Sequence, residues 1–157
     1  MEMTSLSNQN PVPVLLVEDD PDDVAIAKRA FKKGRISNTL YVVRDGEEAM
    51  DFLRQTGAYA DGENEAPRPG LILLDLNLPR LDGREVLEII KNDEDLSCIP
   101  VVVLTTSSEE ADVMGCYERG ANTYITKPVE FNSFLQAVLT IGQYWLTIAE
   151  IPEKREG

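Results

Sequence analysis

Short apolar runs alternate with helical patterns along most of the chain. The runs are rich in valine, leucine and isoleucine and lack polar alternation, which is typical of strands buried on both faces. We expect strands at 12–17, 38–44, 71–74, 99–104 and 123–126. Between them, apolar residues recur three and four positions apart, as on a helix that packs on one side. We expect helices from Pro21 onward and over 46–54, 84–92, 109–119 and 131–148.

This alternation predicts the fold class. Apolar strands that alternate with helices form a parallel sheet covered on both faces, which makes the chain a doubly wound α/β domain with five strands. A length of 157 residues fits one such domain. We expect it to span 12–150, between a flexible N-terminal segment at 1–11 and a C-terminal tail at 151–157.

The stretch 56–70 departs from this regular pattern. It carries glycines, prolines and acids over about fifteen residues, which is longer than most connections in compact domains. We interpret it as an inserted surface loop. An arm that binds a partner is the alternative.

Composition excludes several classes of function. The formal charge is −13, with 28 acidic against 15 basic residues, so we expect no nucleic-acid partner. No apolar run approaches the roughly 20 residues of a membrane helix, and the N-terminus lacks a signal-peptide pattern, so we expect a cytoplasmic protein without a membrane partner. The chain has no histidine, so a histidine that donates a phosphoryl group would belong to another protein. Cys98 and Cys116 lack metal or redox spacing, and we expect both to be buried, inert thiols.

Polar residues stand where the predicted strands end. The carboxyl ends of parallel strands meet at one edge of the sheet, where ligands bind in folds of this type. The residues at this edge are Glu18, Asp19 and Asp20 after the first strand, Asp75 after the third, Thr105 after the fourth and Lys127 after the fifth.

These residue types suit phosphoryl transfer. Clustered carboxylates without histidine or thiolate favour a hard cation such as Mg²⁺, and like charges need such a cation or Lys127 to compensate them. A carboxylate can attack phosphorus and form an acyl phosphate. The transfer then depends on positioning and charge neutralisation, to which Lys127 and the Thr105 hydroxyl can contribute.

Four segments strengthen this interpretation. VLLVEDDP, LILLDLNLPRLDG, VVVLTT and YITKP, in this order, resemble the receiver domain of bacterial two-component response regulators over about 12–148. The resemblance implies a flavodoxin-like sheet with strand order 2-1-3-4-5, and it places the phosphoryl acceptor at Asp75.

The resemblance also implies roles for individual residues. It places the metal ligands at Glu18, Asp19 and Asp75 and at the backbone carbonyl of Asn77. It makes Lys127 the phosphate-binding lysine, Thr105 and Tyr124 the switch residues, and the Lys127–Pro128 bond cis. Glu18 departs from the aspartate more common at its position, and its longer arm can bind the ion directly or through water.

Structural alternatives remain for several of these residues. Either Asp19 or Asp20 can cap the helix that begins near Pro21 while the other binds metal. Asp82, before Gly83, is expected in a turn or cap. Tyr124 can serve in core packing alone.

The family resemblance sets the expected partners. It implies a sensor histidine kinase as phosphoryl donor, and the inserted loop and tail resemble regulators that partner bacterial phytochromes. The last helix carries Tyr144, Trp145, Leu146 and Ile148 on more than one face, which favours a homodimer through this helix. The alternative is that the helix end folds back onto the domain.

Two rival functions are distinguishable. A phosphatase-like hydrolase would use Asp75 as nucleophile, but it needs a second acid two residues later, where Asn77 stands. A degenerate receiver would bind partners without phosphorylation, but Asp75, Thr105 and Lys127 are all present. We therefore expect a phosphoacceptor signalling domain whose only chemistry is self-phosphotransfer and autodephosphorylation.

Overall fold

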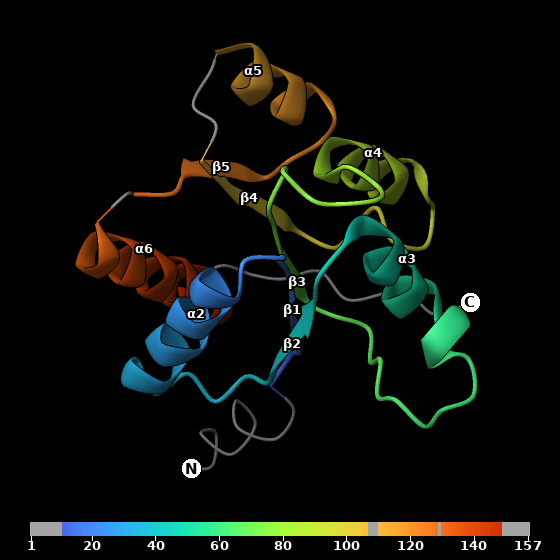
Figure 1. Ribbon diagram of the computed structural model, residues 1–157, viewed down its shortest axis with the longest axis horizontal. Coiled ribbons are helices and arrows are strands. Elements are labelled where there is room, and N and C mark those ends of the chain that lie inside the picture. The colour runs from blue at the N-terminus through green and yellow to red at the C-terminus, as the bar shows by residue number, and fades with distance from the viewer. Residues whose placement is uncertain (1–10, 107–109, 129, 149–157) are drawn as a thin grey trace.

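The computed structural model describes residues 11–106, 110–128 and 130–148 (Figure 1). Its strands form a single parallel sheet in the order β2-β1-β3-β4-β5, which confirms the predicted fold class and strand order. The strands are β1 (Val14–Val17), β2 (Leu40–Val43), β3 (Leu71–Leu74), β4 (Val101–Thr105) and β5 (Thr123–Thr126).

The helices follow the predicted pattern closely. They are α2 (Pro21–Lys33), α3 (Gly46–Arg54), α4 (Gly83–Asn92), α5 (Glu110–Glu118) and α6 (Phe131–Gln143). The last helix covers the predicted 131–148, but it is not α-helical throughout. It widens at Tyr144 into a π-helical turn, η2 (Tyr144–Ile148), and there Trp145 and Leu146 pack against the core. Among the described residues, no helix is long and apolar enough to cross a membrane.

Helices cover both faces of the sheet (Figure 1). Leu15, Val17 and neighbouring strand residues of the same parity pack against α3 and α4 on one face. Val14, Leu16 and their counterparts pack against α2 and α6 on the other. Each fully buried aliphatic side chain of this kind stabilises the fold by about 1.5–3 kcal/mol. The strands whose carboxyl ends carry the polar residues are therefore stabilised by helices on both faces of the sheet.

The inserted loop packs against the domain. It contains the short helix η1 (Gly57–Tyr59), and the Tyr59 ring contacts Phe52 edge-on at a centroid distance of 5.3 Å. The Tyr59 hydroxyl donates to Glu48 at 2.7 Å, and the Tyr41 hydroxyl donates to Glu65 at 3.1 Å. Burial and the bond to Glu48 raise the pKa of Tyr59 to about 12. These contacts fix the loop to α3 and β2.

The two cysteines differ in environment. Both are free thiols, and Cys116 is buried as predicted. The prediction for Cys98 is wrong, since this residue is exposed. It lies in the surface connection between α4 and β4, where Arg68 Nη2 donates to its sulfur at 3.3 Å.

Candidate functional site

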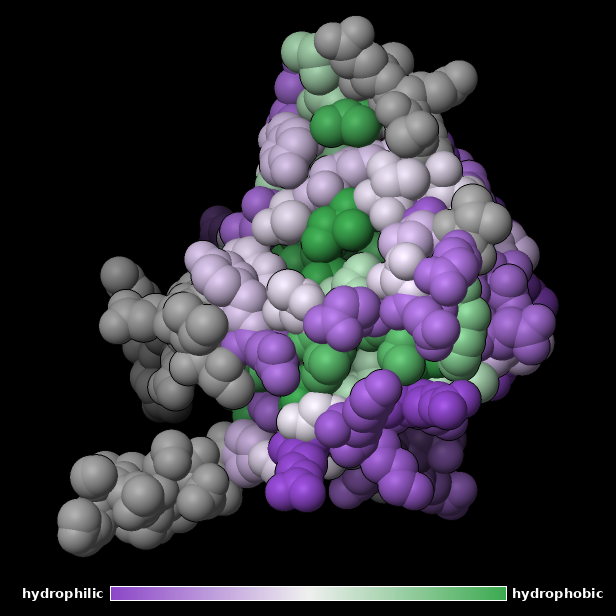
Figure 2. Space-filling view, turned by 90° about the vertical axis from the view of Figure 1, so that its left-hand side faces the viewer, coloured by the Kyte–Doolittle hydropathy of each residue, from purple (hydrophilic) through white to green (hydrophobic). Residues whose placement is uncertain are grey.

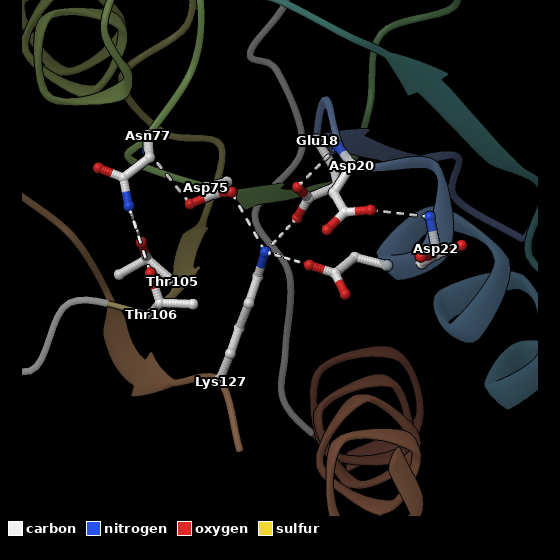
Figure 3. A network of polar contacts seen from close by, with 9 residues as sticks. Glu18, Asp20, Asp22, Asp75, Asn77, Thr105, Thr106 and Lys127 are labelled. Atoms are coloured by element: carbon white, nitrogen blue, oxygen red, sulfur yellow. Dashed lines mark hydrogen bonds and ion pairs between the residues drawn. The ribbon is translucent and has the colours of Figure 1, made fainter. Parts of the chain in front are cut away.

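Four strands deliver polar side chains to one edge of the sheet. Figure 3 shows Lys127 reaching between Asp75 and Glu18, with Asn77 and Thr105 on the opposite side of Asp75. The backbone sets this arrangement: the Asp75 N–H donates to the Val17 carbonyl at 3.1 Å, and the Lys127 N–H donates to the Thr105 carbonyl at 2.6 Å. The parallel register thus places the residues that follow each strand side by side.

Lys127 binds three carboxylates with its ammonium group. Nζ lies 2.5 Å from Glu18 Oε1, 2.8 Å from Asp23 Oδ2 and 3.2 Å from Asp75 Oδ2. Burial would lower the pKa of Lys127, but the hydrogen bonds with Asp23 and Glu18 and the nearby charges raise it above its ordinary value. Lys127 therefore stays protonated and places a positive charge next to Asp75.

Three acids form a cluster that can bind a metal ion. Oxygen atoms of Glu18, Asp19 and Asp75 all lie within 4.8 Å of one another. Burial raises the pKa of Glu18 from 4.5 to about 8, although its hydrogen bond with Lys127 opposes this shift, and the charge of Asp75 adds to it. One lysine thus does not fully offset the clustered charge. An all-oxygen set of this kind fits a hard divalent cation such as Mg²⁺ or Mn²⁺.

Asp20 takes the capping role that the sequence left open between Asp19 and Asp20. Its Oδ1 accepts from the Asp22 N–H at 2.9 Å at the start of α2, and its own N–H donates to Glu18 Oε2 at 3.2 Å. Asp19 is exposed and contributes an oxygen to the acid cluster.

Asp82 is a helix cap, one of the two roles expected for it. Its side chain accepts from the Arg84 N–H at 2.9 Å, and Glu85 completes a capping box at the start of α4. It takes no part in the acid cluster.

Asn77 connects Asp75 with the hydroxyl side of the site. Its N–H donates to Asp75 Oδ1 at 3.2 Å, and its Nδ2 lies 3.4 Å from the hydroxyl oxygens of Thr105 and Thr106. Thr105 is fully buried. Its hydroxyl therefore lies on the protein side of the site rather than in solvent.

Tyr124 lies on the same face of the sheet as Thr105. It is half-buried and packs against the core cluster beneath α3 and α4, while Thr105 pairs with Thr126, two residues further along β5. The Tyr124 N–H donates to the Tyr117 hydroxyl at 3.1 Å. Packing and a switching role are both compatible with this position.

The predicted cis bond at Lys127–Pro128 is wrong. The described residues contain no cis peptide bond. The trans form is favoured even before proline by about 0.5–1 kcal/mol, and Lys127 contacts its three carboxylates from that form.

Asp23 is the site residue that the sequence analysis missed. It lies in the first turn of α2 rather than at the end of a strand, so a search along strand ends passes over it. Its position carried a usable signal: α2 begins two residues after Asp19, so the first turn of this helix starts next to the acids that follow β1.

The parallel sheet, its strand order and the acids, threonine and lysine at its carboxyl edge define a class of signalling domain. Residues 14–139 match the family model described as the response regulator receiver domain, so the chain belongs to this family.

Individual relatives narrow the assignment. The chain is 47% identical to response regulator Rcp1 of Synechocystis sp. over 142 residues, which is 90% of this chain and 94% of that protein. The crystal structure of the Mn²⁺-bound form of Rcp1 has a TM-score of 0.85 and 45% identity, covering 91% of this chain and 100% of that one. The phosphorylated cyanobacterial phytochrome response regulator RcpA has a TM-score of 0.84 and 44% identity, covering 90% and 99%. The chain is thus a homologue of phytochrome response regulators.

Proposed function

We propose that Asp75 accepts a phosphoryl group from a phosphohistidine of a sensor histidine kinase. The observation that carries the proposal is the placement of a buried Asp75 carboxylate 3.2 Å from the Lys127 ammonium, among acids that can hold a cation. An Asp75 oxygen attacks phosphorus and the P–N bond breaks. The electron pair of that bond stays on the imidazole, which leaves neutral because its other nitrogen carries the proton.

The remaining site residues neutralise charge in this proposal. We assign Mg²⁺ as the resident cation, with Glu18, Asp19, Asp75 and the backbone carbonyl of Asn77 as ligands; when bound, it offsets negative charge on the phosphoryl oxygens. Lys127 donates to a phosphoryl oxygen, and the Thr105 hydroxyl donates to another. The existence of an Mn²⁺-bound form of Rcp1 and of a phosphorylated form of RcpA supports both elements of the assignment.

Phosphorylation would act on the rest of the molecule through Thr105 and Tyr124. Thr105 moves toward the phosphoryl group, and Tyr124 turns into the space beside it, because both side chains lie on the same face of the sheet. The surface near β5 changes as a result, and the affinity for partner proteins changes with it. We also propose that the protein is cytoplasmic, signals through contacts with other proteins and binds no nucleic acid.

We assign the phosphoryl donor to a phytochrome-type kinase. The support is the similarity over 90% of the chain to the phytochrome response regulator RcpA. A phosphorylated phytochrome-type kinase should transfer its phosphoryl group to this protein faster than unrelated histidine kinases do. Equal rates from all donors would overturn this assignment while leaving the acceptor role intact.

The last helix would supply a homodimer interface. A groove between β5 and α6 is lined by Ile125, Ala137, Ile141, Tyr144 and Trp145. Figure 2 shows apolar residues in a recess on this side of the molecule, bordered by weakly polar ones. Trp145 packs partly against the core, which agrees with the alternative that the helix end folds back onto the domain. Tyr144, however, remains 49% exposed. Covering this groove with a second copy would remove apolar surface from water.

Labelling with a small phosphodonor tests the acceptor role. With acetyl phosphate and Mg²⁺, the protein should gain one phosphoryl group, recovered on the peptide that contains Asp75. Recovery on another peptide would contradict the proposal. Sustained hydrolysis of a phosphomonoester would instead favour the phosphatase-like alternative.

A further inference from the structure

The Lys127 ammonium has a partner outside the predicted acceptor and metal residues. An ammonium carries three hydrogens, and Lys127 directs them at Glu18, Asp75 and Asp23. The contact with Asp23, at 2.8 Å, is shorter than the contact with Asp75, at 3.2 Å. Asp23 is therefore a principal contact of the lysine.

Asp23 differs from the other two acids in its surroundings. Its side chain is 19% exposed, against 4% for Glu18 and 8% for Asp75, so it binds the ammonium from the solvent side. Among the described residues, the acids whose oxygens lie close enough together to share an ion are Glu18, Asp19 and Asp75, without Asp23. A cation would thus engage two partners of Lys127 and leave the third in place.

The helix that carries Asp23 holds it firmly. Asp20 caps the first turn of α2, and Val24, the next residue after Asp23, is buried against the sheet. The α2 helix also packs along α6, which begins shortly after Lys127. Asp23 is thereby fixed on a rigid element beside the flexible lysine side chain.

We propose that Asp23 is a positioning residue that holds the Lys127 ammonium beside Asp75 for phosphoryl transfer. This inference rests on the proposed acceptor function. Lysine has a long side chain with many rotamers, and ordering it costs conformational entropy that a fixed carboxylate offsets before the phosphodonor arrives. Asp23 itself touches no phosphoryl oxygen, and it acts through Lys127.

Rates of phosphorylation by acetyl phosphate test this role. Asp23→Ala should lower the initial rate about tenfold, the effect of losing one charge-assisted hydrogen bond. Asp23→Asn, which retains an oxygen acceptor, should stay within about threefold of the wild type. Asp22→Ala is the matched control, because it removes the same charge from the same turn at an exposed position.

Two further measurements separate positioning from a general structural role. In a Lys127→Met background, Asp23→Ala should have no additional effect on the rate, since its partner is gone. In metal-free wild type and Asp22→Ala, the Lys127 ammonium protons should exchange slowly enough for a resolved signal in heteronuclear NMR. Asp23→Ala should lose that signal while its circular dichroism stays unchanged.

The outcomes distinguish this proposal from the acceptor function. If the wild type is phosphorylated on Asp75 but Asp23→Ala matches Asp22→Ala in rate and NMR signal, the positioning role is wrong and the acceptor role stands. An undiminished effect in the Lys127→Met background also overturns it. If the wild type takes no phosphoryl group on Asp75, the acceptor function itself fails.

Discussion

Glu18 is a buried acid whose protonation links the site to the stability of the fold. Its pKa is raised from 4.5 to about 8 by burial, so the folded protein binds its proton more tightly than the unfolded chain does. The resulting stabilisation is complete below the ordinary pKa of 4.5 and is lost as the pH rises toward about 8.

This linkage gives a pH-dependent prediction. In the presence of a chelator, the free energy of unfolding should fall between pH 4.5 and about 8, and it should fall less steeply in Glu18→Gln. Urea denaturation across this range measures both slopes. Equal slopes in the two proteins would show that Glu18 carries no raised pKa in the metal-free fold.

At the residue scale, the sequence predicted which side chains meet at the carboxyl edge of the sheet, because the strand topology brings them together. Glu18, Asp75 and Lys127 follow strands, and parallel strands bring their carboxyl ends together whatever the side-chain detail. Asp23 depends on the rotation of a helix about its axis, which strand ends do not specify. Cys98 was mistaken for a core residue because its apolar character does not reveal that its connection runs over the surface.

At the scale of elements, the start of α4 packs directly against the backbone of Asp75 and Leu76, which follow β3. A Cβ atom added at Gly83, the first residue of α4, would lie 2.2 Å from the Asp75 carbonyl oxygen and 2.6 Å from Leu76 Cα. Both are backbone atoms, so the clash cannot be relieved by rotating a side chain. Glycine at this position lets the helix begin directly beside the acceptor.

Gly83→Ala should therefore affect both stability and chemistry. We expect the free energy of unfolding to fall by about 3 kcal/mol, the upper range for overpacking, and phosphorylation to slow because the Asp75 backbone shifts. Gly62→Ala is the control: no atom lies within 4 Å of its added Cβ, and its positive φ of 83° should cost only about 1 kcal/mol. Urea denaturation and acetyl phosphate labelling check the pair, and equal losses would contradict the seating of α4.

Element bounds were largely predictable, and the exceptions have local causes. Periodicity placed the strands because their apolar runs end abruptly in charged or polar residues. Apolar residues recur at helical spacing through Trp145, so the sequence predicted one continuous helix. This periodicity does not show where α-helical hydrogen bonding changes to a π-helical turn. The cis bond at Lys127–Pro128 was implied by the family resemblance and not by a local pattern, and the trans form found there is the one that X–Pro bonds favour intrinsically.

At the scale of the whole molecule, the groove between β5 and α6 predicts self-association. Light scattering should give a mass near twice 17.5 kDa for the wild type, measured with and without a phosphate mimic. Tyr144→Glu should lower the dimer fraction, because it places a charge where apolar surface would be covered. Met114→Glu is the control, an exposed apolar residue on α5 outside the groove lining. A monomeric wild type, or equal effects of both variants, would contradict this interface.

The central claim is that this receiver domain carries its phosphoryl group on Asp75. The most direct test is intact-mass measurement after incubation with acetyl phosphate and Mg²⁺, comparing the wild type with Asp75→Asn and with Asp82→Asn. Asp82 caps α4, and asparagine is an equally good cap, so this control should keep the fold. We predict one added phosphoryl group on the wild type and on Asp82→Asn, and none on Asp75→Asn. A phosphoryl group that persists in Asp75→Asn, or a wild type that gains none, would contradict the account.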